Sequence, residues 1–148
     1  MLDEIRLPSY ELKAWRIADS VDLTCMREEA QSLIGTHDFR AFRSSNDLRT
    51  NTVRTILNIN IVESSLKGAC LVQLEVEGTA FLHNMVRIIV GTLVDVARGR
   101  LPRGAVVRAL VSGDRKHLGM TAPAQGLCLN EIRWLDKPML SDDYWPRS

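Results

Sequence analysis

Two stretches alternate between apolar and polar side chains and predict an antiparallel hairpin. Residues 52–64 are rich in β-branched side chains, and residues 69–76 place apolar and polar positions on opposite faces. A period of two is typical of a strand with one buried face. The stretch 64–68 ends in a glycine and is typical of a turn, so we expect the two strands to pair.

Three other stretches repeat their apolar residues at helical spacing. Residues 81–97 are the strongest, because nine of the thirteen residues from 85 to 97 are apolar. A helix that is apolar nearly all round is buried in the centre of a domain. Residues 102–112 predict a shorter helix, and residues 22–34 predict one that begins after an aspartate cap and ends before Gly35.

The rest of the chain completes an α+β pattern. Residues 10–18 and 126–134 predict further strands, residues 36–51 predict a polar loop with a short turn, and the tail from about 136 is irregular. Strands and helices in this order favour an antiparallel sheet with helices packed on one face. At 148 residues, the chain 1–148 is expected to be a single domain.

The composition is that of a soluble globular protein, with 45% hydrophobic and 25% charged residues. No apolar run is long enough to span a bilayer, and the N-terminus lacks the pattern of a secretory signal. The three cysteines are too far apart for a zinc site and favour a reducing compartment. We therefore predict a cytoplasmic location, with an organellar one left open, and no membrane association.

The net charge of +1 conceals an uneven distribution. Residues 79–118 contain seven basic and two acidic side chains. A basic region of this kind is compatible with a polyanionic partner. A solvated helical face is the alternative interpretation.

Arg87 stands out because apolar residues flank it on both sides in the predicted central helix. A guanidinium stays charged, and burying it without a partner is costly. Arg87 must therefore reach solvent or meet a carboxylate or phosphate. Gly91, one turn further on, leaves space for another segment to approach. An internal pair with Asp95 is the structural alternative, although two helical turns separate the residues.

The polar loop 36–51 contains several arginines near Phe39 and Phe42. Such arginines can contact RNA phosphates, or they can be plain surface charge, while the phenylalanines are expected to anchor the loop to the core. The chain lacks phosphate-binding, dinucleotide-binding, zinc-protease and serine-hydrolase motifs. Its three histidines are too isolated to form a triad or a metal site, so no metal site is predicted.

Four strings in this order carry a family resemblance: GTHDFRAFR from Gly35, VRTI from Val53, EGTAFLHNMVRIIVG from Glu77 and TAPAQGLCL from Thr121. Together they resemble the C-terminal half of the TruA-type tRNA pseudouridine synthases over residues 10–134. The resemblance implies an enzyme that converts uridine in the tRNA anticodon stem-loop to pseudouridine, without cofactor or metal. The target base must leave its stack to be reached.

The resemblance also assigns roles to individual residues. In the family, an aspartate from the N-terminal half attacks the nucleotide, and an arginine from the C-terminal half pairs with it. Arg87 matches that arginine by its place in the string FLHNMVR. The expected substrate contacts are Leu127, Arg40, Arg43, Arg54 and His83. For Leu127, an ordinary core position in the predicted strand 126–134 is the alternative.

The N-terminal half of the family pattern, with its nucleophile, has no counterpart in this sequence. Arg49-Thr50-Asn51 resembles the catalytic Arg-Thr-Asp only superficially, because an amide is a poor nucleophile, and Asp38 is expected to be a turn residue. The chain alone is therefore expected to be inactive and to need the missing N-terminal half as a partner. The resemblance further implies tRNA as a partner and, because the family forms homodimers, a second copy of the chain. A non-catalytic RNA-binding module and a structural or self-association domain are the alternatives.

Overall fold

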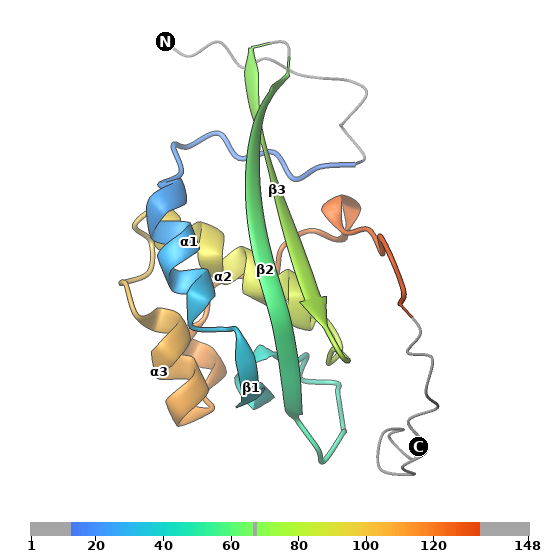
Figure 1. The fold of residues 1–148 in the computed structure, drawn as a ribbon. Helices are drawn as coiled ribbons and strands as arrows, with labels where there is room; N and C mark the ends of the chain where they lie inside the picture. The colour runs from blue at the N-terminus through green and yellow to red at the C-terminus, as the bar shows by residue number, and fades with distance from the viewer. Residues whose placement is uncertain (1–12, 67, 134–148) are drawn as a thin grey trace.

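The computed structural model describes residues 13–66 and 68–133, which form an α+β fold (Figure 1). Its elements, in chain order, are α1 (Leu23–Gln31), β1 (Gly35–Asp38), the 3-10 helix η2 (Arg40–Phe42), β2 (Val53–Leu66), β3 (Ala69–Gly78), α2 (Met85–Ala97), α3 (Ala105–Ser112), and the 3-10 helices η3 (Arg115–His117) and η4 (Ala124–Gly126). The described strands form one antiparallel sheet in the order β1-β2-β3. The predicted fold class is confirmed.

The sheet buries one face. Along β2, Ile59 and Ile61 are buried while Asn58 and Asn60 are exposed, as the predicted alternation requires. The β2–β3 register pairs Ile59 with Val76 and Ile61 with Leu74, so the apolar side chains of both strands share this face. Between Ile56 and Asn58 the register shifts at a bulge. The predicted hairpin is confirmed, and its far end extends beyond the helices (Figure 1).

The helices pack against the apolar face of the sheet. In α2, Ile88, Ile89 and Leu93 are buried in the same cluster as the apolar residues of β2. The predicted burial of this helix is confirmed. The Asp22 side chain accepts the N–H of Cys25 at 3.0 Å and caps α1, as its sequence position predicts.

Several predicted boundaries shift for identifiable reasons. The stretch 36–51 is not all loop, because residues up to Asp38 pair with β2 and η2 follows. Phe39 and Phe42 are fully buried with their rings edge to face, which confirms their anchoring role. The central helix begins at Met85 and not at residue 81, because Asn84 has a left-handed backbone with φ 60°.

The two predicted outer strands are wrong within the described residues. Residues 13–18 are irregular, although Trp15 and Ile17 still pack against the core. Gly126 ends η4, residues 127–133 are irregular, and Leu129 is 77% exposed. Alternation sets which side chains face the core, but a strand also needs a neighbouring strand to bond. Residues 10–12, Trp134 and the tail from about 136 lie outside the described residues, and the single domain stays a prediction.

Candidate functional site

Arg87 lies in the first turn of α2 and is held at two points. Its Nε donates to the carbonyl oxygen of Ala122 at 2.7 Å, and its Nη1 donates to Oδ1 of Asn84 at 3.1 Å. The side chain is partly buried, and both acceptors are uncharged. Over residues 13–66 and 68–133, no carboxylate pairs with it. The guanidinium is therefore oriented while its charge is not neutralised by a described neighbour.

The acceptor from Ala122 belongs to a segment, residues 118–123, that runs along α2. Gly91 allows this approach, since a Cβ atom there would lie 1.7 Å from the carbonyl oxygen of Met120. The space predicted beside Gly91 is thus filled by another segment. The N–H of Ala122 donates back to the carbonyl oxygen of Arg87 at 3.0 Å, so helix and segment are joined in both directions.

Asp95 fastens the same segment and does not pair with Arg87. Its Oδ2 accepts the N–H of Met120 at 3.2 Å, and Thr92 Oγ1 accepts the N–H of Gly119 at 3.1 Å. The alternative of an Arg87–Asp95 pair is wrong. Each of the two side chains is bonded to the segment 118–123, Arg87 to Ala122 and Asp95 to Met120, and not to the other.

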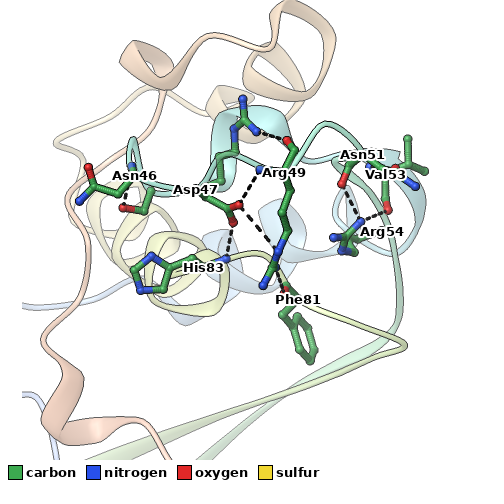
Figure 2. A network of polar contacts seen from close by, with 10 residues as sticks. Asn46, Asp47, Arg49, Asn51, Val53, Arg54, Phe81 and His83 are labelled. Atoms are coloured by element: carbon green, nitrogen blue, oxygen red, sulfur yellow. Dashed lines mark hydrogen bonds and ion pairs between the residues drawn. The ribbon is translucent and has the colours of Figure 1, made fainter. Parts of the chain in front are cut away.

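The chain just before α2 is fastened by Asp47, which is only 9% exposed (Figure 2). One carboxylate oxygen accepts the N–H of His83 at 2.9 Å, and the other accepts the N–H of Arg49 at 3.1 Å. Arg49 in turn donates from Nη1 to the carbonyl oxygen of Phe81 at 3.2 Å. Residues 44–49 and 81–83 are thereby joined through both backbone and side chains.

The charge state of Asp47 follows from these contacts. Burial alone would raise the pKa of the Asp47 carboxyl, but the N–H groups of His83 and Arg49 and the guanidiniums of Arg49 and Arg43 outweigh it. The net result is a pKa below the ordinary value. The carboxylate is therefore ionised at neutral pH, as a twofold acceptor of N–H groups should be.

The predicted arginines do not gather at one point. Arg43 donates to the carbonyl oxygen of Arg49 at 2.6 Å, which joins it to the Asp47 network. Arg54 donates to the carbonyl oxygen of Val53 at 2.7 Å, next to Asn51 (Figure 2). Arg40 instead reaches the end of α3, where its Nη2 donates to the carbonyl oxygen of Ser112 at 3.3 Å.

The other predicted contacts are exposed. The His83 side chain is exposed, while its backbone joins the Asp47 network. Leu127 is 53% exposed and follows η4, so it is not the core residue of a strand. Both positions are open to a partner, and their role as substrate contacts stays a prediction.

Asp38 has a turn role, as expected, and Asn51 makes a similar local hydrogen bond. Asp38 accepts the N–H of Arg40 at 3.0 Å and the hydroxyl of Thr52 at 2.5 Å. Oδ1 of Asn51 accepts the N–H of Val53 at 3.1 Å. In the part of the chain that the structure describes, no group of His, Cys, Asp or Glu is placed to hold a metal ion. None of the described helices has the length and hydropathy of a membrane-spanning segment.

The sequence pattern did not reveal Asp47, Asn84 or Ala122. Asn84 carries the one usable signal, since asparagine is the residue other than glycine that best tolerates a left-handed backbone. Asp47 and Ala122 act through partners 36 and 35 residues away, a separation that no local period encodes.

Comparisons with known proteins agree on one family. Residues 30–134 match the family profile described as tRNA pseudouridine synthase. The chain is 42% identical over 138 residues to tRNA pseudouridine synthase A of Citrifermentans bemidjiense, covering 93% of this chain and 54% of that protein. It is 43% identical over 133 residues to the Geobacter sp. strain M21 protein of the same name, covering 89% and 52%. It is 46% identical over 130 residues to tRNA pseudouridine synthase A of Syntrophotalea carbinolica, covering 88% of this chain and 50% of that protein. The chain therefore spans about half the length of the relatives it matches.

Proposed function

This chain belongs to the tRNA pseudouridine synthase family, and from that premise we propose that it supplies the arginine side of a catalytic cleft. The whole enzyme would convert uridine in the anticodon stem-loop of tRNA to pseudouridine. The half of the relatives that this chain does not match would supply the aspartate nucleophile.

The orientation of Arg87 is the observation that carries this proposal. Its Nε and one Nη donate to Ala122 and Asn84, which leaves the other Nη for an incoming carboxylate. A guanidinium pairs well with a carboxylate through two parallel N–H groups, but one remaining nitrogen still gives a charge-assisted bond. Because the Arg87 guanidinium is already oriented before the aspartate arrives, it would stabilise the ionised aspartate without rearranging during the reaction.

The reaction itself is an isomerisation. The aspartate attacks the nucleotide, the bond between uracil N1 and ribose C1′ breaks, and the base turns. A new bond then forms between C5 and C1′ as the bond from the aspartate to the nucleotide breaks, C5 loses its proton and N1 gains one. Atoms and electrons balance without a cofactor. In this reaction Arg87 holds the carboxylate of the aspartate. We propose Leu127 and His83 as contacts of the displaced base and of the RNA backbone next to it.

A fusion protein tests the proposal. The unmatched half of the Citrifermentans bemidjiense relative would be joined to this chain, and pseudouridine formation would be measured on unmodified tRNA. We expect product from the fusion and none from the chain alone. Arg87→Ala should lower the rate by about 10²–10³, the usual cost of removing a preorganised electrostatic group. Arg108→Ala, an exposed arginine on α3, is the matched control and should retain the rate.

Other outcomes separate the alternatives. Product from the chain alone would contradict the proposal and make Asp38 and Asp95 the next residues to substitute. Binding of tRNA by a folded fusion without product would favour a non-catalytic RNA-binding module. Absence of tRNA binding would favour a structural or self-association domain. The homodimer and the cytoplasmic location stay predictions.

A further inference from the structure

Asp47 is a buried carboxylate that does not touch Arg87 but fastens the backbone just before it. Resting on the proposed function of Arg87, we propose that Asp47 is a positioning residue: it fixes residues 81–84, and through Asn84 it sets the direction of the Arg87 guanidinium. The aspartate lies on the loop between η2 and β2, so this connection joins two segments far apart in the sequence (Figure 2).

The first step of the connection is the backbone of His83. Its N–H donates to Asp47 Oδ2 at 2.9 Å, and its carbonyl oxygen accepts the N–H of Ser44 at 3.0 Å. Both sides of one residue are thus bonded to the same loop. Arg49 adds a third bond two residues earlier, to the carbonyl oxygen of Phe81. This part of the backbone is therefore fixed before the helix starts.

The second step leads from His83 to Arg87. Asn84 follows directly, with φ 60°, and its Oδ1 accepts Nη1 of Arg87 at 3.1 Å. A left-handed residue persists only where its surroundings hold it there. The bonds to His83 provide that restraint on one side, and α2 provides it on the other. Releasing His83 would let Asn84 relax and would remove one of the two acceptors that orient Arg87.

The position calls for a carboxylate. Each of its oxygens accepts a different backbone N–H, from His83 and from Arg49. An asparagine has a single acceptor oxygen, so one N–H would face an NH2 group instead. The burial of the charge is offset by these bonds and by Arg49 Nε at 3.8 Å.

The chain offers a matched control in Asp114. Its carboxylate accepts the N–H of Lys116 at 3.0 Å and pairs with Lys116 Nζ at 3.1 Å, at the start of η3. The pKa of Asp114 is also lowered, chiefly by the bonds to Lys116. Both aspartates therefore fix a loop, but only Asp47 is bonded to the segment that leads into α2.

The test observes Arg87 directly in the full chain. Nitrogen-15 NMR of the arginine side chains would follow exchange of the Arg87 Nη–H groups with water, because Nη1 donates to Asn84, with the signals assigned by their loss in Arg87→Lys. In Asp47→Asn we expect exchange about tenfold faster, the scale of one lost charge-assisted bond. In Asp114→Asn we expect a change below about twofold. Unchanged exchange in Asp47→Asn, or an equal change in both variants, overturns the proposal.

Activity of the fusion protein gives an independent readout. Asp47→Asn should lower kcat while leaving KM for tRNA nearly unchanged, because a misdirected Arg87 affects the nucleophile more than RNA binding. A raised KM with unchanged kcat would overturn the positioning role and indicate an RNA contact. If the unsubstituted fusion forms no pseudouridine, the proposed function fails, whereas the NMR result still decides whether Asp47 positions Arg87.

Discussion

At the scale of the residue, Asn84 combines a backbone role with a side-chain role. Its φ of 60° ends the preceding segment and sets the start of α2, while its Oδ1 holds Nη1 of Arg87. Apolar spacing over 81–97 predicted the helix but not this start, because a period describes side chains and not backbone handedness. A polar residue of the site can be recognised from the sequence only where its neighbours are apolar. Arg87 meets this condition, whereas Asp47 lies among other polar residues of a loop and gives no such signal.

Two substitutions separate the roles of Asn84. Asn84→Ala should lower the free energy of unfolding by about 1–2 kcal/mol, because a Cβ-bearing residue without a locally bonding side chain is strained in the left-handed region. Asn84→Gly should cost less, since glycine adopts this region without strain. Both should increase exchange of the Arg87 Nη–H groups, because both remove the acceptor of Nη1. Urea unfolding measures the first effect, and equal destabilisation by both substitutions would show that backbone strain is not its cause.

At the scale of the element, α2 and the segment 118–123 behave as one unit. Gly91 brings them into contact, and the hydrogen bonds of Ala122 and Met120 to Arg87 and Asp95 run along the helix. The sequence predicted α2 and the hairpin because their local periods agree with their burial. It failed for 13–18 and 126–133, because the described chain gives these segments no strand to pair with.

Gly91→Ala tests this unit by the sign of its effect. At an open helical position, alanine stabilises relative to glycine by up to about 1 kcal/mol. Here the new Cβ would overlap the carbonyl oxygen of Met120, a backbone atom that has no other rotamer to adopt. We therefore expect a loss of about 1–3 kcal/mol in urea unfolding, typical of overpacking. The amides of Met120 and Ala122 should exchange faster, and a stabilised variant would contradict the close approach.

At the scale of the whole molecule, the positive charges at the two ends of α2 differ in their partners. Near its C-terminal end, Arg98 and Arg100 pair with Asp19, and Arg103 pairs with Glu28 at 3.0 Å. On the side of η2, Arg40 pairs with Asp38 only at 3.9 Å, and Arg43 donates to a backbone carbonyl oxygen, which leaves its charge in place. The near-neutral total charge of the chain therefore conceals two basic regions. The region near the C-terminal end of α2 is paired with acidic side chains, whereas the region around Arg43 is less neutralised and adjoins the Asp47 network.

Two matched double substitutions test which region meets RNA. Arg40→Ala with Arg43→Ala and Arg100→Ala with Arg103→Ala each remove two positive charges, so a purely long-range effect would be equal in both. If the first pair binds phosphates, only that variant of the fusion protein should bind tRNA more weakly and with a shallower salt dependence. The slope of log K against log salt should fall by about 0.7–0.9 for each phosphate that is no longer neutralised.

Equal reductions of affinity would place the effect in the net charge and not in phosphate binding by Arg40 and Arg43. A reduction confined to the Arg100 and Arg103 variant would move the RNA to the far end of α2, away from Arg87.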